Sequence, residues 1–259
     1  MSNRPLSMIG TAAAMGQAPS RPYLPSLTLR FSAAALIRSA LVRDLLAIAV
    51  LAAVTGAFFW PSITAGLVYY ENDTRIFYYP LFARLSEALK ARTLPLWSPN
   101  VFGGYPIFAD GEAGPFYPLH LLTLLLLPVE TAFTWLRPIR FFQGALFSYL
   151  FCRTLHVGRF GAIIGSLSFA YSGFAVAQMH HTNINAAAVW LPLVLAFGEL
   201  AVGARGQLRY LFALFAGVAI GLQALIIHVQ VVLMTAIVFS LYCGSRCLFG
   251  PVGVGEGPL

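Results

Sequence analysis

The sequence predicts an all-α membrane protein, a polytopic transmembrane helix bundle of about six spans with one large outer loop. Two observations carry this prediction. The chain is 59% hydrophobic and only 10% charged, whereas a soluble domain carries about 25% charged residues. It also contains repeated apolar runs of about 20 residues, the length that an α-helix needs to cross the hydrocarbon core. Membrane lipid is therefore the first expected partner.

The net charge of +7 fits the same fold class. An excess of Lys and Arg in a membrane protein indicates loops that face the cytoplasm. No long basic cluster is present, so we expect no binding of nucleic acid.

Residues 1 to about 30 are rich in Pro, Ser, Ala and Gly and show no clear periodicity. We expect the segment 1–43 to be a flexible N-terminal tail in the cytoplasm. The apolar run at about 45–67 predicts the first span, because it is too long for the core of a signal peptide. The transmembrane domain is expected over 44–249. The Gly-rich residues 250–259 are expected to form a disordered tail.

The predicted outer loop covers about 68–129 and holds five of the nine acidic residues. Four apolar residues recur there at every fourth position: Phe77, Leu81, Leu85 and Leu89. This spacing predicts an amphipathic juxtamembrane helix on the membrane surface, and Pro80 suits its first turn. The Pro- and Gly-rich stretch that follows predicts turns. The apolar residues 119–127 are too few to span the membrane.

The remaining spans are expected at about 130–152, 160–178, 184–203, 208–227 and 229–248. A rival topology instead makes 118–136 and 141–157 two separate spans. The preferred topology places ten of the 16 Lys and Arg residues on the side of the N-terminus, so the positive-inside rule favours it. It leaves Arg137 and Arg140 near the outer end of a helix, where they can snorkel or bind an anion.

The first candidate site follows the first span directly. Glu71 and Asp73 lie two residues apart and beside Arg75. Two carboxylates at a membrane surface can supply a general base or hold a divalent metal, the one cofactor that this pattern suggests. The alternative is a solvated helix boundary at which Asp73 caps the amphipathic helix.

The second group of candidates gathers at the outer ends of later spans: His180, His181, Asn183, Asn185, His228 and Gln230. Polar groups between apolar helices indicate a site for phosphate, sugar hydroxyls or a metal. The alternatives are a hydrated turn at 180–185 and a polar hinge at 228–230. The aromatic residues of the outer loop suit either anchoring among lipid headgroups or stacking on carbohydrate.

The outer loop resembles the hallmark of the YfhO-type bacterial membrane proteins, which have a glycosyltransferase C (GT-C) architecture. In that family an acidic residue after the first helix is followed by P-L-W-(S/N)-P, F-G-G-x-P and F-Y-P. The corresponding parts here are Asp73, PLWSP at 95–99, FGGYP at 102–106 and FYP at 116–118. The later segments YSGFAVAQMHHTNINAAAVWLPL and GLQALIIHVQ also resemble the family, with Ile227 and Val229 in place of a Gly and a Pro.

The resemblance covers about 45–248 and implies a glycosyltransferase on the outer face of the bacterial cytoplasmic (inner) membrane. Its donor would be a polyprenyl-phosphate-linked sugar and its acceptor a cell-envelope polymer or lipid. It assigns catalysis to Asp73, which Glu71 is expected to orient. The residues expected to bind the substrates are Arg75, Trp97, Asn100, Gly103, Gly104, Asp110, Arg137, Arg140, His180, His181, Asn183, Asn185, His228 and Gln230.

Members of the family are longer and have more spans, so the chain is expected to be a truncated form. The alternative to a glycosyltransferase is a non-catalytic membrane protein, either a degenerate fragment or a lipid-binding or transport subunit. A transporter should carry paired charges in the middle of its spans. The charged residues here lie mostly at span ends and in the outer loop, which favours the enzyme.

Overall fold

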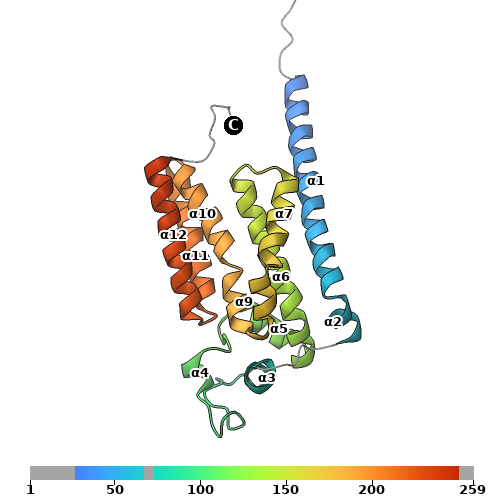
Figure 1. Cartoon of the computed structure of the whole chain (residues 1–259), viewed down its shortest axis with the longest axis vertical. Helices are drawn as coiled ribbons and strands as arrows, with labels where there is room; N and C mark the ends of the chain where they lie inside the picture. Colours follow the sequence, from blue (N-terminus) through green and yellow to red (C-terminus); the bar gives the residue numbers. More distant parts are fainter. Residues whose placement is uncertain (1–26, 67–72, 251–259) are drawn as a thin grey trace, which may run out of the picture. The chain divides into compact units, whose positions relative to one another are not determined.

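Every described element of secondary structure is a helix (Figure 1). The computed structural model describes residues 27–66 and 73–250, with side chains from Arg38 onward. Within those residues the only strand-like pairing is an isolated bridge between Ser98 and Tyr105. The prediction of an all-α fold is confirmed. The predicted site residue Glu71 lies outside the described residues.

The first helix, α1 (Leu27–Phe58), differs from the prediction at both ends. It begins inside the segment 1–43 that we expected to be a flexible tail, because its Ala- and Leu-rich sequence favours a helix. It ends before the predicted boundary of the first span, and α2 (Trp60–Ala65) follows. Pro61 in α2 cannot donate a backbone hydrogen bond, which explains the interruption. The chain divides into two compact units at Arg43.

Five segments of the described chain are long and apolar enough to cross a membrane. They are Arg38–Phe58, Arg159–His180, Thr182–Gly203, Gln207–Ala224 (α11) and Val229–Phe249 (α12). The sixth predicted span is α6 (Val129–Thr154), which has 26 residues and is therefore long enough. Its four charged residues make it less apolar, and it packs against the neighbouring helices α7 and α10.

Two of these five segments are each made of more than one helix. The segment Arg159–His180 consists of α7 (Arg159–Ala170), α8 (Gly173–Ala177) and a 3-10 turn at Gln178–His180. The segment Thr182–Gly203 consists of α9 (Thr182–Ala188) and α10 (Leu191–Gly203). The hydroxyl of Ser172 caps α8 by accepting a hydrogen bond from the Ala175 N–H at 3.3 Å. Pro192 lies in the first turn of α10, where it has no N–H to donate.

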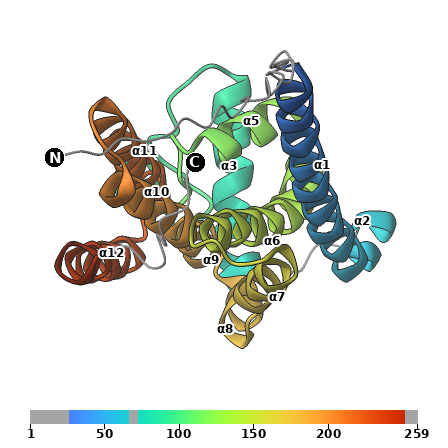
Figure 2. The same ribbon diagram turned by 90° about the horizontal axis from the view of Figure 1, so that it is seen from above.

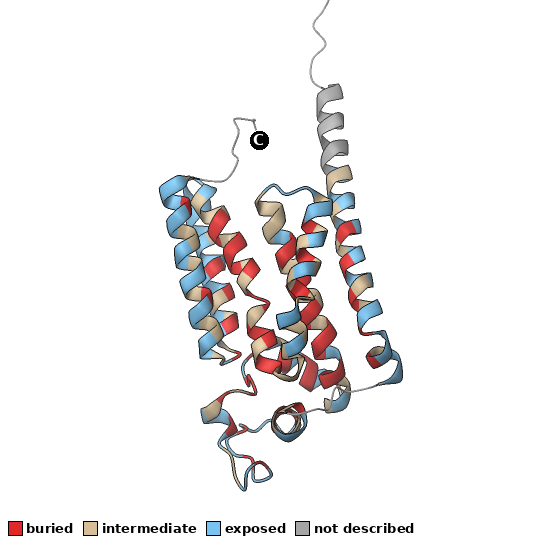
Figure 3. Ribbon diagram, viewed as in Figure 1, coloured by how far each residue is buried: buried red, intermediate tan, exposed pale blue. Residues whose placement is uncertain are grey.

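The predicted amphipathic helix is α3 (Tyr79–Lys90), with Pro80 in its first turn. It runs across the ends of the bundle helices and is seen end-on in Figure 1. Its apolar face packs on α5 and α6, so protein and not lipid covers that face. Leu81, Phe82 and Leu85 on this face have no exposed surface. Figure 3 colours the whole chain by burial and shows many buried residues in α6, α9 and α10.

The Pro- and Gly-rich stretch after α3 forms turns, the short helix α4 (Ile107–Asp110) and then α5 (Pro118–Leu126). At 9 residues, α5 is too short to span a membrane, as predicted. Val101 and Ile107 are buried in one hydrophobic cluster with side chains of α3, α5 and α6. The outer loop is therefore packed onto the bundle.

Within the unit Arg43–Leu259, the outer loop, the α8–α9 break and the α11–α12 turn lie at one end, which we call the loop end (Figures 1 and 2). The α6–α7 and α10–α11 turns lie at the opposite end. Because α6 is one continuous helix, the rival topology with separate spans at 118–136 and 141–157 is excluded.

Two ion-pair networks hold the helices together at the opposite end. Asp44 of α1 accepts hydrogen bonds from Tyr149 of α6 at 2.7 Å and from Arg159 of α7 at 2.8 Å. Arg246 of α12 pairs with Glu199 of α10, and both side chains are buried. These contacts fix α1 and α12 on the bundle at the end away from the outer loop.

Candidate functional site

Asp73 lies directly before a π-helical turn, Thr74–Tyr78, that leads into α3. Such turns are rare and frequently occur at functional sites. Oδ2 of Asp73 lies 3.1 Å from Nε2 of His181. The other ring nitrogen of His181, Nδ1, lies 2.5 Å from the side-chain oxygen of Gln178. Nε2–H of a neutral His181 donates to Asp73 when Nδ1 accepts from the N–H of a flipped Gln178 amide, so Gln178 and Asp73 hold the imidazole between them.

This pairing answers two questions that the sequence left open. Asp73 makes no capping hydrogen bond to the backbone, so the interpretation of this residue as a helix cap is wrong. Asp73 instead meets the polar cluster at 180–185, which confirms that these two distant candidates lie together at the loop end.

Glu112 of the outer loop joins the same group of side chains. The Tyr78 hydroxyl donates to Oδ1 of Asn183 at 2.6 Å, and Nδ2 of Asn183 donates to Oε2 of Glu112 at 3.3 Å. The backbone N–H of Glu112 donates to Oδ2 of Asp110 at 3.1 Å. These bonds connect the π turn, α9 and the outer loop.

Two glycines shape the turn that carries Glu112. Gly111 has φ +73° and Gly114 has φ +58°, a region that favours glycine. A Cβ atom at Gly111 would lie 2.2 Å from Cδ1 of Ile227, and one at Gly114 would lie 2.8 Å from Nδ1 of His120. The turn therefore packs directly against both the α11–α12 turn and α5, which fixes the position of Glu112.

These side chains line a cavity of about 480 Å³ at the loop end, which we call the acid cavity. Its lining residues are Asp73, Ile76, Phe77, Tyr78, Phe102, Glu112, His181, Asn183, Ile184 and His228. The wall combines carboxylates, imidazoles and an amide with aromatic rings. Phe77 and Phe102 are stacked, with ring centroids 6.1 Å apart. Such a wall can hydrogen-bond hydroxyl groups and also contact the apolar face of a sugar ring.

Arg137 and Arg140 are buried at the loop end of α6, with 5% and 2% of their surface exposed. Arg137 donates to the Met179 carbonyl at 3.2 Å and to the Thr74 hydroxyl at 3.1 Å. Arg140 donates to the Thr182 carbonyl at 3.1 Å. Both arginines thus bind backbone carbonyl groups at the break between α8 and α9. The expectation that they snorkel toward the outer surface is wrong.

Arg140 also contacts a buried histidine of α5. Nη2 of Arg140 lies 2.6 Å from Nε2 of His120, and Nδ1 of His120 lies 3.1 Å from the Ala113 carbonyl oxygen. Because arginine only donates and a carbonyl only accepts, the proton of a neutral His120 is on Nδ1. Burial, and then the charge of Arg140, lowers the pKa of His120 well below its usual value.

The two carboxyl groups of the acid cavity have different surroundings. Asp73 has 49% of its side chain exposed and faces an imidazole. Glu112 is more enclosed, and burial together with the nearby charge of Asp110 raises its pKa. Burial also lowers the pKa of His228, whose Nδ1 accepts from the Val231 N–H at 3.4 Å at the start of α12. Burial therefore favours the uncharged forms of Glu112 and His228 in this cavity.

Four predicted site residues line the acid cavity: Asp73, His181, Asn183 and His228. Eleven described ones do not: Arg75, Trp97, Asn100, Gly103, Gly104, Asp110, Arg137, Arg140, His180, Asn185 and Gln230. Asn185 braces the α8–α9 break, because its side chain donates to the carbonyls of Ala175 and Gln178. The Trp97 indole packs against Gly104, where a Cβ atom would lie 2.3 Å from Cζ2 of Trp97.

Sequence reasoning missed several residues of the site, notably Tyr78, Glu112 and the buried His120. Glu112 carried a usable signal, because it is an acid in a turn of closely spaced glycines. Tyr78 carried none, since it reads as an ordinary member of the apolar pattern that leads into α3.

No group of three or more His, Cys, Asp or Glu side chains in the described part of the chain has the geometry to hold a metal ion. No described residue is therefore assigned to the divalent metal that the sequence pattern suggested. Comparisons with protein-family models, with curated proteins and with solved structures find no match for the chain.

Proposed function

We propose that the chain is a membrane glycosyltransferase, or a fragment of one, with its N-terminus inside and its loop end outside the bacterial inner membrane. It moves a sugar from a polyprenyl-phosphate carrier to a cell-envelope polymer or lipid. The YfhO-type series of motifs in the outer loop and the all-α bundle support the proposal. The single observation that carries it is the Asp73–His181 pair inside the acid cavity.

The residues of the cavity match the needs of an inverting transfer. The acceptor hydroxyl oxygen attacks the anomeric carbon, its proton passes to Asp73, and the bond from that carbon to the carrier phosphate breaks, with its electron pair leaving on the phosphate. Asp73 is exposed enough to reach an acceptor, and His181 holds its carboxylate in place. Positive charge builds on the sugar ring in the transition state, and the carboxylates of the cavity stabilise it.

Binding of the two substrates can be assigned to neighbouring groups. Arg75 is exposed on the π turn that follows Asp73 and can donate hydrogen bonds to the leaving phosphate. Phe102 is 73% exposed at the cavity and offers a face for stacking on a sugar. Glu112 and Asn183 supply hydrogen-bonding groups for sugar hydroxyls.

A transfer assay in proteoliposomes tests the proposal. Isotope-labelled polyprenyl-phosphate sugars are supplied with cell-envelope acceptors, and the label recovered in the acceptor is measured. Asp73→Asn keeps the shape and removes the base, so we expect transfer to fall by about a hundredfold or more. Glu87→Gln is the matched control, because Glu87 is an acid of α3 with 65% of its side chain exposed.

Three results would count against the proposal. Transfer by Asp73→Asn at the parent rate would show that Asp73 is not the base. A loss in Glu71→Gln alone would reverse the roles of the two acids. A parent chain that inserts normally and transfers no sugar from any donor would favour the non-catalytic alternative, a degenerate fragment or a lipid-binding or transport subunit.

A further inference from the structure

Thr74 joins segments that are far apart in the sequence. It is the first residue of the π turn and has no exposed surface. Its hydroxyl donates a hydrogen bond to the His180 carbonyl at 3.1 Å and accepts one from Nη2 of Arg137 at 3.1 Å. We call this contact among Thr74, His180 and Arg137 the Thr74 clasp. It connects the π turn both to α6 and to the 3-10 turn at Gln178–His180.

The Thr74 clasp lies beside the Asp73–His181 pair on both segments of the chain. Asp73 directly precedes Thr74, and His181 directly follows His180. The side chains of Asp73 and His181 are 49% and 30% exposed. A pair with this exposure contributes little to its own stability, because water competes for both groups. A buried contact is therefore needed to fix the geometry of the pair, and the clasp lies directly next to it.

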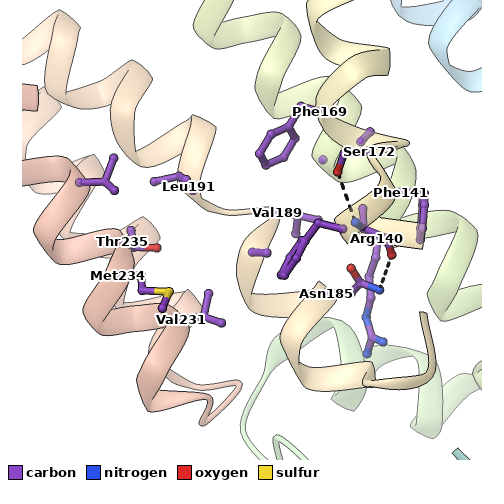
Figure 4. A pocket seen from close by; sticks show the side chains of 16 residues that line it. Arg140, Phe141, Phe169, Ser172, Asn185, Val189, Leu191, Val231, Met234 and Thr235 are labelled. Carbon is purple, nitrogen blue, oxygen red and sulfur yellow. Dashed lines mark hydrogen bonds between the residues drawn. The ribbon is translucent and has the colours of Figure 1, made fainter. Parts of the chain in front are cut away.

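The backbone that the clasp grips is itself braced by buried side chains. The residues whose side chains donate hydrogen bonds to carbonyl groups around the α8–α9 break are Thr74, Arg137, Arg140 and Asn185. All four are buried. Figure 4 looks into the pocket beside this break and draws the bond from Asn185 to the Ala175 carbonyl as a dashed line. Because this backbone is held from several sides, a hydrogen bond to the His180 carbonyl fixes the position of its donor.

The hydroxyl group of Thr74 is the part of the side chain that makes the clasp. Arg137 is charged, so its bond to the hydroxyl is charge-assisted and stronger than a bond between neutral groups. Valine has the same shape as threonine but has a methyl group in place of the hydroxyl. Thr74→Val therefore removes both bonds of the clasp and leaves the packing volume unchanged.

We propose that Thr74 is a positioning residue for the proposed glycosyl transfer, because the Thr74 clasp holds the Asp73 carboxylate against His181. Thr74 does not line the acid cavity, so it acts through Asp73 and not on the substrate. The expected effect on transfer rests on the proposed function. The expected effect on the π turn does not, since it follows from the hydrogen bonds of the clasp alone.

The transfer assay in proteoliposomes tests the effect on the reaction. We expect Thr74→Val to lower kcat at least about tenfold, because the base is misplaced, and to change the KM for the donor by less than about twofold. Thr74→Ser keeps the hydroxyl and should restore most of the transfer. Thr134→Val is the matched control, because Thr134 is a buried threonine whose hydroxyl bonds only within α6, to the Glu130 carbonyl.

A double variant separates positioning of Asp73 from a general structural defect. If Thr74 acts through Asp73, adding Thr74→Val to Asp73→Asn should cause no further loss of transfer. A general defect would instead lower the residual transfer of Asp73→Asn by the same factor as it lowers that of the parent, and this result would overturn the proposal.

Hydrogen exchange of the peptide that covers the π turn tests the clasp without using activity. Exchange, corrected for the intrinsic rate, should be about tenfold faster in Thr74→Val than in the parent, which is the scale of one lost hydrogen bond. Thr74→Ser and Thr134→Val should exchange like the parent. If the parent transfers no sugar, the proposed function fails, and this measurement still decides whether the clasp holds the turn beside Asp73.

A second variant keeps the test valid if Thr74→Val does not fold. Thr74→Ala also lacks the hydroxyl and introduces no bulk, so the same changes in kcat and in exchange are expected. A folded Thr74→Val or Thr74→Ala protein whose π turn exchanges like the parent would overturn the proposal. So would transfer by either variant at the parent rate, or a loss in Thr74→Ser as large as that in Thr74→Val.

Discussion

Leu85 on α3 holds the outer loop on the bundle, and its replacement by alanine tests that role. The side chain has no exposed surface and packs in one cluster with Phe82 and Phe133. Removing a buried leucine side chain costs about 2–5 kcal/mol, and we expect about 3 because the surrounding aromatic rings cannot collapse into the space. At about 1.4 kcal/mol per factor of ten, the population in which α3 is detached should rise by about a hundredfold.

Hydrogen exchange of the peptide that covers α3 measures this population. Glu87→Ala is the matched control, because Glu87 is exposed on the same helix and its 3.1 Å pair with Arg84 contributes about 0.5 kcal/mol or less. We expect much faster exchange in Leu85→Ala than in Glu87→Ala. Equal exchange in the two variants would refute the docking of α3 on α5 and α6. It would support the sequence-based interpretation of a helix that lies on the membrane.

Two further outcomes are expected from the site and from the proposed orientation. The folded protein binds the Glu112 proton more tightly than the unfolded chain, because burial raises the pKa of Glu112. The stability of the 110–114 turn should therefore be highest below the ordinary Glu pKa of about 4.3 and fall as the pH rises through the raised value. Hydrogen exchange of the turn, corrected for the intrinsic rate, should show this fall in the parent and not in Glu112→Gln. The proposed orientation is tested by cysteine labelling of intact cells with a membrane-impermeant maleimide, in a background without the native cysteines. The reagent should label Arg92→Cys at the loop end and should not label Arg205→Cys at the opposite end. The reverse pattern would contradict the proposed orientation.

Periodicity and run length predicted the elements of the fold well. Long apolar runs placed α11 and α12 nearly to the residue, and the four-residue spacing located α3. These signals are local, since they depend on the composition of one continuous segment. The breaks at Ser172 and Pro192 were missed, because a window of apolar residues does not register the single residue that ends a helix.

Contacts between residues that are distant in the sequence decide whether lipid or protein covers a helix face. The same contacts decide which side chains come together at a site. The spacing in α3 showed which residues share a face, but whether lipid or protein covers Leu81 depends on the positions of α5 and α6. The contact of Asp73 with His181 followed from counting spans, which put both residues at one end. Glu112 reaches Asn183 across 71 residues, and neither the spacing nor the charge pattern of the sequence indicates that pairing.

The most direct test of the central claim is a double-mutant cycle on the Asp73–His181 pair in the proteoliposome transfer assay. If Asp73 is the base and His181 acts through it, Asp73→Asn and His181→Gln remove the same contribution. The double variant should then transfer sugar within about threefold of the slower single variant. Losses that multiply in the double variant, or transfer by either single variant at the parent rate, would contradict the account.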